Sequence, residues 1–398
     1  MSVVITGIGV NSPIGCNLIE AFQNITSGFK GISNIQCFNT DSFPSTFGAE
    51  VKENGNVLKT SAEVDRKALF INNSFRDLIA ANDFLQRYQP DCVTINIGAG
   101  IDYFDLESYV SSGDYLAEKW QNHCSRAIDV IKKLANKYNI KGGHFVNVSA
   151  CVASTQAIGN SFRMLRKAKN KAIITGGFDS MLSHLHFMGF YKLGALSSYN
   201  GNAEEACKPF DKNRCGLVIG EGGIALLLET SESARKEDIL AEIVGYSSTI
   251  DAYQVTDPEP NGTLLAIAAK EAIAEAGISP NDIDCVHLHE TGTIKNAMAE
   301  AKAMELIFGQ RFNTIPVYSM KGQIGHLIGA CGGMEFLGIL YSIINQKVPP
   351  TVNFETPDPE VPLNVIKGNA LELNIKYILK LNAAFGGQNT ALVIKKHG

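Results

Sequence analysis

The sequence predicts an α/β protein whose sheets are covered by helices on both faces. Short runs rich in β-branched residues recur along the whole chain, and helical patterns such as Thr263–Ala276 lie between them. Buried strands that alternate with helices are typical of sheets with helices on both sides. The 398 residues are 45% hydrophobic and 19% charged, which is enough apolar material for a large core.

The predicted strands come in two series. The first is VVITGIGV, CVTINIGAG, HFVNVSA, KAIITGGFDS and GIALLLET, and the second is AEIVGYSST, CVHLHETGT, TIPVYSM and TALVIKK. The polar stretch TSESARKED between them predicts a boundary, with one half at 1–233 and the other at 234–398. In each half a strand leads into a helix rich in small residues. This echo indicates a duplicated fold with a catalytic site shared between the halves.

Composition argues against several classes of protein. The net charge of −5 opposes a protein built mainly to hold nucleic acid. The start MSVVITGIGV lacks a signal-peptide pattern and the nine cysteines form no CxxC pair, so we expect a cytoplasmic protein with free thiols. The apolar stretch Ile324–Ile343 contains a histidine, a glutamate and five glycines, which predicts a buried core helix and no membrane span.

Cys151 is a candidate nucleophile because it lies where the strand HFVNVSA runs into a helix. A thiol there feels the positive end of the helix dipole and unpaired backbone N–H groups, which favour the thiolate. Its small neighbours let the backbone turn tightly and leave the sulfur accessible. A cysteine in such a segment can equally be a small buried hydrophobe, so this segment alone leaves both interpretations open.

Two histidine pairs raise the question of a metal site. Strand alternation places His287 and His289 on the same face of the sheet, and His184 and His186 form a second HxH pattern. No third and fourth ligands follow at zinc-like spacing. We therefore predict no metal.

His326 lies in SMKGQIGHLIGACGG, five residues after Lys321. A histidine in this glycine-rich apolar segment is either a functional group or a core side chain that donates to a backbone carbonyl. In PFDKNRCGLVIGEGG, the charged residues Asp211, Lys212 and Arg214 predict an internal ion-pair network, because the glycines that follow imply close backbone approach.

Taken together, these segments resemble the β-ketoacyl-acyl-carrier-protein synthase family, closest to its elongating type I/II branch. Five motifs occur in the family's order: Ser149–Cys151 around the nucleophile, PFDxxRxGFxxGEG at 209–222, HGTST at 289–293 with Glu300 as its acid, KxxxGHxxGAxG at 321–332, and GFGGxN at 384–389. The resemblance covers nearly the whole chain. It implies a thiolase-like fold, a five-layered αβαβα sandwich built from two similar halves.

The resemblance also implies a two-stage reaction. An acyl group passes to Cys151 from a phosphopantetheine thioester of an acyl carrier protein, and a malonyl thioester then loses CO₂ and attacks it to give a β-ketoacyl product. It implies that His289 and His326 stabilise the enolate, that Lys321 and Glu300 form an orienting charged pair, and that the N–H groups of Cys151 and Ala383 bind the oxyanion. No cofactor is expected beyond the carrier's own arm.

The same resemblance assigns residues that contact the substrates and partners. The implied substrate-binding residues are Phe190, His186, Thr291, Thr293, Ala383 and Phe385. Basic residues for carrier docking fall on Arg66 and Lys67, with Lys132 and Lys133 as a second cluster. The implied assembly is a homodimer, with a heterodimer containing a related subunit as an alternative.

Several positions depart from the family pattern. Glu290 stands where the family usually has glycine, and Cys215 replaces an acid. Ala383 occupies the position we align with the phenylalanine gate of the acyl pocket, so the mouth should stand open unless Phe385 or Met188 closes it. These departures predict a substrate other than an ordinary fatty acyl chain, such as an unsaturated or aryl-capped chain of a secondary-metabolite pathway.

Two other functions compete with this one. A thiolase would need a second cysteine in the closing loop, but that loop reads AFGGQN and no cysteine follows Cys331. A chain-length-factor-like subunit, which shapes the pocket of a catalytic partner, would usually lack the nucleophile that this chain has at Cys151.

Overall fold

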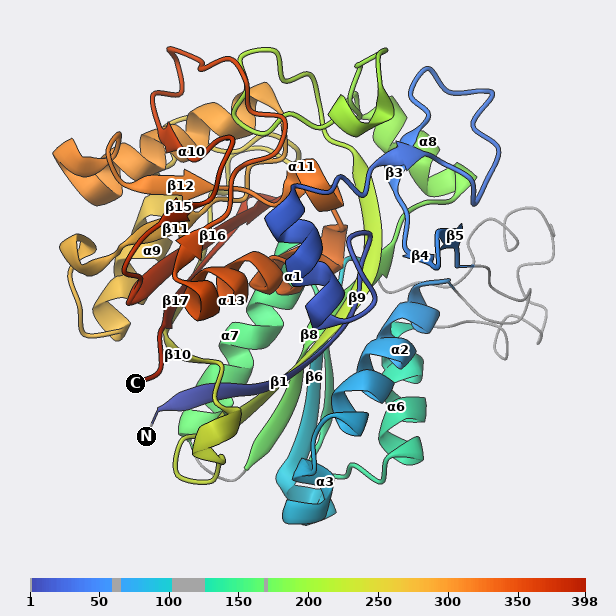
Figure 1. The fold of residues 1–398 in the computed structure, drawn as a ribbon, viewed down its shortest axis with the longest axis vertical. Coiled ribbons are helices and arrows are strands. Elements are labelled where there is room, and N and C mark those ends of the chain that lie inside the picture. Colours follow the sequence, from blue (N-terminus) through green and yellow to red (C-terminus); the bar gives the residue numbers. More distant parts are fainter. Residues whose placement is uncertain (1, 59–65, 102–125, 168–170) are drawn as a thin grey trace.

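The computed structural model describes residues 2–58, 66–101, 126–167 and 171–398 (Figure 1). Its main sheet has 13 strands, with the order β14-β12-β11-β16-β17-β10-β1-β9-β8-β6-β7 and with β2 and β3 attached beside β9. The strands of the first half are β1 (Val3–Asn11), β2 (Ser33–Asn34), β3 (Phe47–Ala49), β6 (Val93–Ala99), β7 (His144–Val148), β8 (Ala172–Ser180) and β9 (Ile219–Thr230). Those of the second half are β10 (Ala241–Ile250), β11 (Cys285–His287), β12 (Pro316–Tyr318), β14 (Asn364–Val365), β16 (Tyr377–Ala384) and β17 (Gln388–Lys395). Two small hairpin-like pairs, β4 (Lys52–Glu53) with β5 (Asn56–Val57) and β13 (Lys347–Val348) with β15 (Leu371–Glu372), lie outside it.

The two halves repeat the same strand topology. In the first half β1 pairs antiparallel with β9, β9 antiparallel with β8, and β8, β6 and β7 follow in parallel. In the second half β10, β17 and β16 are joined antiparallel, and β16, β11 and β12 are parallel. A short antiparallel contact between β1 and β10 joins the halves. The predicted echo is therefore present in the topology, while the split at 233/234 itself stays a prediction.

Helices form three layers around these strands. The helices are α1 (Leu18–Ser27), α2 (Arg66–Ala80), α3 (Phe84–Arg87), α6 (Ala127–Lys137), α7 (Ala153–Arg166), α8 (His184–Lys192), α9 (Thr263–Glu275), α10 (Ile294–Phe308), α11 (Lys321–Ile324), α12 (Cys331–Met334) and α13 (Phe336–Asn345). Figure 1 shows α2 and α6 on one side, α9 and α10 on the other, and α7 and α13 between them. The predicted five-layered thiolase-like α/β sandwich is confirmed.

The hydrophobic core follows these layers. The central core contains apolar side chains of α7 and α13 together with strand residues of both halves, such as Ile5 and Ile394. A second core lies between the strands of the second half and α9 and α10, and a third lies beneath α2 and α6. The inner strands of the main sheet are thus buried on both faces, which explains why they read as nearly continuous apolar runs.

The apolar segment Ile328–Asn345 is long and apolar enough to cross a membrane, and 89% of it is buried inside the protein. It forms the end of the central helix layer, so the prediction of a buried core helix is confirmed. The eight cysteines within the described ranges are free thiols, as expected; Cys124 lies outside those ranges.

Candidate active site

A cavity of about 520 Å³ opens between the two halves of the fold. Eight of the predicted site residues line it, namely Cys151, Phe190, His289, Thr291, Thr293, His326, Ala383 and Phe385. His186 does not line it. Phe190 reaches the cavity from α8, whereas His186 lies one turn earlier and its Nδ1 is 2.8 Å from the hydroxyl of Ser183.

The chain reaches Cys151 through a sharp turn between β7 and α7. Ala150 has a φ of 48°, and Cys151 lies in a single 3₁₀ turn, Ala150–Val152, before α7 begins. Neighbouring elements leave no room for side chains here. A Cβ at Gly98 of β6 would lie 2.3 Å from the backbone of Ala153, so only glycine lets the start of α7 approach the sheet.

The thiol of Cys151 is almost fully buried. Burial raises its pKa to about 12, while the charge of Lys321 and the N–H groups of Phe385 and Cys151 act to lower the pKa. Burial thus opposes the thiolate, which we expected the helix dipole and the backbone N–H groups of this turn to favour.

The same contacts identify the backbone donors around the sulfur. Besides its own N–H, the sulfur of Cys151 faces the N–H of Phe385. Ala383 lies two residues earlier and is paired with Asn389 in the ladder between β16 and β17. Our assignment of the second oxyanion donor to Ala383 is therefore corrected to Phe385, because the chain leaves β16 only after Ala384.

His289 lies just beyond β11 and is buried. Its Nδ1 is 3.0 Å from Nδ2 of Asn382 and 3.4 Å from Nζ of Lys321. Both neighbours can only donate, so Nδ1 accepts and the ring proton lies on Nε2. Burial and the charges of Lys321 and His326 hold the pKa of His289 well below its usual value, which keeps the ring neutral.

His326 reaches the same tautomer by a different route. Its Nδ1 accepts the N–H of Ile328 at 3.0 Å, which places the ring proton on Nε2. Burial, followed by the charge of Lys321, lowers the pKa of His326 to about 3. The rings of His289 and His326 lie edge to face with centroids 5.2 Å apart. Two neutral imidazoles with Nε2–H groups thus lie side by side in the cavity wall.

Lys321 has a different acidic partner from the one we predicted. Its Nζ contacts Glu335 Oε1 at 2.5 Å and the carbonyl oxygen of His289. Glu300 instead accepts the backbone N–H groups of His289 and Glu290, at 2.7 and 2.8 Å. The expected Lys321–Glu300 pair is thus corrected: Glu300 holds the His289 turn, and Glu335 pairs with the ammonium.

Strained backbone occurs next to each of the three candidate catalytic side chains. Ala150, directly before Cys151, has a φ of 48°. Glu290, directly after His289, has a φ of 21°, and Ile328, shortly after His326, has a φ of 48°. Non-glycine residues with positive φ are costly and cluster at functional sites. These turns aim the three side chains into one cavity.

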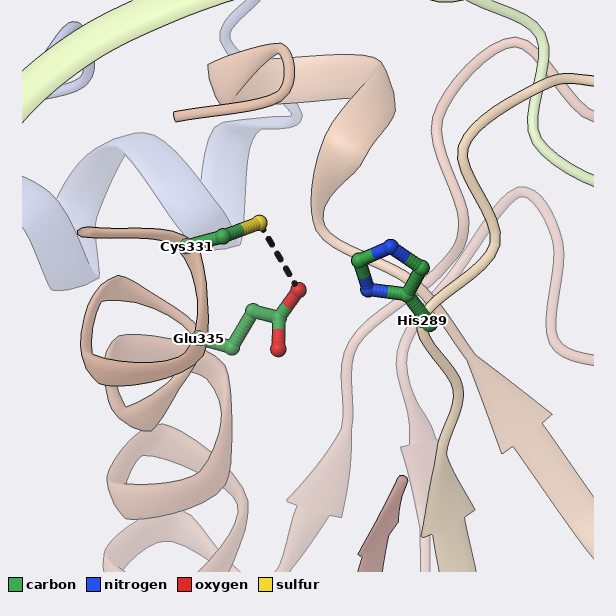
Figure 2. A group of neighbouring side chains, drawn as sticks. All are labelled: His289, Cys331 and Glu335. Carbon is green, nitrogen blue, oxygen red and sulfur yellow. Dashed lines mark hydrogen bonds between the residues drawn. The ribbon is translucent and has the colours of Figure 1, made fainter. Parts of the chain in front are cut away.

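His289, Cys331 and Glu335 form a cluster with potential metal-ligand atoms within 4.8 Å of one another (Figure 2). The thiol of Cys331 donates to Glu335 Oε1 at 3.3 Å. The carboxylate of Glu335 already carries two ammonium partners, Lys321 and Lys380, the latter at 3.0 Å. These two cations oppose a further positive ion at this cluster, and the absence of a metal stays a prediction.

The charged turn at 209–216 forms the expected internal network, with one exception. Arg214 pairs with Asp358 at 2.6 Å, and Asp211 accepts the N–H groups of Glu355 and Thr356. The side chain of Lys212 is exposed and forms no ion pair with the described residues, although its backbone N–H donates to the carbonyl of Thr356 at 2.9 Å and its charge helps to lower the pKa of Asp358.

The predicted docking pair turns inward. Arg66 binds the buried carboxylate of Glu221 on β9, and Lys67 is only 7% exposed, near Asp179. A buried carboxylate requires a counter-charge, and the first turn of α2 supplies it. The prediction that Arg66 and Lys67 bind a carrier protein is therefore wrong.

Three buried polar residues of the site were not predicted from the sequence: Glu335, which contacts Lys321, Asn382, which contacts His289, and Lys380, which contacts both of these neighbours. A signal was present, because Glu335 interrupts an apolar helix and Lys380 interrupts the apolar strand YILKLNAA. A charged residue inside such a run is almost never fully buried unless it has a partner.

Known proteins resemble this chain in sequence over nearly its whole length. Family models described as "Beta-ketoacyl synthase, N-terminal domain" and "Beta-ketoacyl synthase, C-terminal domain" match residues 93–234 and 240–355. The 3-oxoacyl-[acyl-carrier-protein] synthase 2 of Staphylococcus aureus (strain COL) is 34% identical over 412 residues, which cover 99% of this chain and 98% of that protein.

Solved structures show the same likeness. A chain from the complex of a type II PKS acyl-carrier protein with its ketosynthase bound to the hexaketide has a TM-score of 0.91 and 26% identity, covering 100% of this chain and 99% of that one. A chain of the ishigamide ketosynthase/chain length factor has a TM-score of 0.86 and 25% identity, covering 100% and 99%. This chain belongs to the β-ketoacyl synthase family.

Proposed function

We propose that the chain is a β-ketoacyl-acyl-carrier-protein synthase that condenses an acyl group on Cys151 with a malonyl-carrier-protein thioester and releases CO₂. The observation that carries the proposal is the meeting of Cys151 with two Nε2–H imidazoles in one cavity. The named relatives are synthases of this kind.

In the first stage, the sulfur of Cys151 attacks the carbonyl carbon of an acyl-carrier thioester. The tetrahedral oxyanion accepts the N–H groups of Cys151 and Phe385, which face the sulfur. The carrier thiol leaves and takes the proton that the Cys151 thiol loses. Because burial favours the protonated thiol, this transfer removes a proton as the S–C bond forms.

In the second stage, the malonyl thioester loses its carboxylate as CO₂, and negative charge develops on the thioester oxygen. The Nε2–H groups of His289 and His326 donate to that oxygen. The carbanion then attacks the acyl carbonyl, the Cys151 thiolate leaves, and the product is a β-ketoacyl thioester. The buried Lys321 lies beside His289 and favours negative charge at this place.

The acyl group is proposed to be an unsaturated or aryl-capped chain. The side chains of Ala383 and Ala384 in the cavity wall are small and leave room for a rigid group. Likeness to the ketosynthase bound to the hexaketide supports a secondary-metabolite substrate. Cytoplasmic residence, which fits the free thiols, is part of the same proposal.

An acyl carrier protein is the proposed partner, since one of the similar solved structures is a ketosynthase bound to its carrier. With Arg66 and Lys67 turned inward, the exposed Lys132 and Lys133 of α6 remain as the candidate basic contact for an acidic carrier.

Charge reversal of both Lys132 and Lys133 should raise KM for the carrier-bound substrate severalfold, and added salt should shrink the difference from wild type. Reversal of the exposed Lys367 and Lys396 changes net charge equally and serves as the control. Equal KM values in the two double variants would contradict this contact.

The experiment that tests the function is acylation of Cys151 by an acyl-carrier thioester, followed by mass spectrometry. Wild-type protein should gain the mass of the acyl group, and Cys151→Ala should gain none and form no β-ketoacyl product while staying folded. A wild-type protein that never becomes acylated would favour the alternative of a non-catalytic, chain-length-factor-like subunit. Condensation by Cys151→Ala at the wild-type rate would show that another residue is the nucleophile.

A further inference from the structure

Fully buried polar side chains, hydrogen-bonded to one another, connect strand β16 with the ring of His289. Lys380 and Asn382 are two residues apart, so both point to the same face of the strand, toward the central helix layer. The intervening Leu381 packs in the outer core instead. In an apolar strand, this places an ammonium and an amide where side chains such as Ile378 fill the central core.

The amide of Asn382 is held from both ends. Its Oδ1 accepts the hydroxyl of Thr155 at 2.7 Å and the ammonium of Lys380. Its Nδ2 donates to Glu335 Oε2 at 2.7 Å and to His289 Nδ1 at 3.0 Å. An ammonium only donates and a carboxylate only accepts, so Lys380 and Glu335 together fix which end of the amide faces His289.

Rotation of this amide by 180° would reverse the chemistry of His289. Oδ1 would then face Nδ1 and favour a ring proton there, against the ammonium of Lys321 at 3.4 Å, and a ring with its proton on Nδ1 has an acceptor at Nε2. An acceptor at Nε2 cannot stabilise an enolate oxygen. The tautomer of His326 does not depend on a side-chain amide, because a backbone N–H donates to its Nδ1.

We propose that Lys380 is a positioning residue, which fixes the amide of Asn382 and thereby keeps the proton of His289 on Nε2. Its need for catalysis rests on the proposed function, whereas its effect on the tautomer does not. Besides Asn382, the ammonium of Lys380 contacts Glu335 Oε2 at 3.0 Å and Thr155 Oγ1 at 3.2 Å. It therefore holds three of the connected polar side chains in place.

The test combines three variants with two readouts. Asn382→Asp replaces the donor beside Nδ1 with a carboxylate oxygen, Lys380→Met removes the ammonium, and Lys380→Gln restores a neutral donor to a side chain of similar size. The first readout is ¹⁵N NMR of histidine-labelled protein, with the signals of His289 assigned from a His289→Gln variant. The second compares CO₂ release from a malonyl-carrier thioester with acylation of Cys151.

In wild-type protein, the NMR spectrum should show Nδ1 of His289 without a proton. Asn382→Asp should protonate it and lower CO₂ release on the order of 10²-fold, as loss of an oxyanion donor does. Lys380→Met should give a smaller loss, about tenfold, with Lys380→Gln between it and wild type. Acylation of Cys151 should stay within about threefold in each, which shows that the variants are folded. The His326 signals should not move.

A protonated Nδ1 in wild-type His289, or a His289 tautomer that is unchanged in Lys380→Met, would overturn the inference. If Asn382→Asp does not fold, the two variants Lys380→Met and Lys380→Gln and the wild-type spectrum still test the inference. Failure of wild-type protein to release CO₂ would overturn the proposed function instead, since the spectra do not depend on turnover.

Discussion

Three fully buried charges, on Lys321, Glu335 and Lys380, lie beside His289. Removing each ion from water costs several kcal/mol, so this set persists only because the three groups are paired and hydrogen-bonded to their neighbours. The carboxylate of Glu335 neutralises one ammonium and leaves about one positive charge beside the cavity. That charge favours the enolate that the proposed reaction forms, and it acts without rearrangement because the groups are fixed.

The buried carboxyls of Glu290 and Glu300 affect how the stability of the protein depends on pH. Burial raises its pKa to about 7, and burial followed by the charge of Glu290 raises the pKa of Glu300 to about 8. Carboxyls whose pKa is raised by folding bind protons more tightly than in the unfolded chain, so stability falls as pH rises from about 4.5 to 8. For Glu290 the loss amounts to at most about 3 kcal/mol.

We expect Glu290→Gln to flatten this pH dependence. The variant should lose less thermal stability than wild type between pH 5 and pH 8.5, because the charge is gone and Glu300 titrates closer to its ordinary value. Thermal unfolding at a series of pH values measures this. Replacement of the exposed Glu360 by Gln provides the control, and parallel Tm curves for Glu290→Gln and wild type would contradict the argument.

At the scale of elements, the turn after β16 combines two tasks. The N–H of Phe385 faces the sulfur of Cys151, and the side chain of Phe385 lines the cavity. The glycines that follow, Gly386 and Gly387, have φ values of 81° and 73°, which side chains rarely adopt. The turn can therefore bend on the carboxyl side of Phe385, whereas Ala383 lies within the paired strand.

We expect Ala383, near the end of β16, to select acyl groups at the pocket mouth. Ala383→Phe should narrow the cavity and slow acylation of Cys151 by rigid polyenoyl or aryl donors by about tenfold, a barrier change near 1.4 kcal/mol. Flexible saturated donors should slow much less, because they can bend past the ring. The donor N–H at Phe385 survives this change. Acylation rates with matched rigid and flexible thioesters measure it, and an equal slowing of both would show that Ala383 does not select substrates.

These elements show what sequence could and could not predict. The nucleophile turn and the two histidines were predictable, because short local motifs fix them. The partner of Lys321 was not, since Glu300 lies on α10 and Glu335 lies between α12 and α13, and only the packing of these elements within the second half brings one of the two to the ammonium. The same holds for Arg66, which turns inward because Glu221 is buried on a strand far along the chain.

At the scale of the whole molecule, duplication explains where the site lies. Each half contains an antiparallel strand pair followed by parallel strands, and each feeds a small-residue helix into the central layer. The turns that start these helices therefore meet near the middle of the fold, one with Cys151 and the other with His326. The second half adds His289 after β11, so neither half has the complete set.

The outer edge of the first half predicts how two copies assemble. Among the strands that the structure describes, β7 ends the sheet, and its Phe145 and Val148 are 48% and 47% exposed. An unpaired edge with apolar side chains favours pairing with the same strand of a second copy. We expect a homodimer, which Val148→Lys should weaken at least tenfold, measured by analytical ultracentrifugation. Because β7 leads directly into the Cys151 turn, the resulting monomer should also acylate more slowly. Val255→Lys, at an apolar residue 77% exposed and away from this strand, is the control. A wild-type monomer, or a Val148→Lys dimer as tight as wild type, would show that β7 is not the interface.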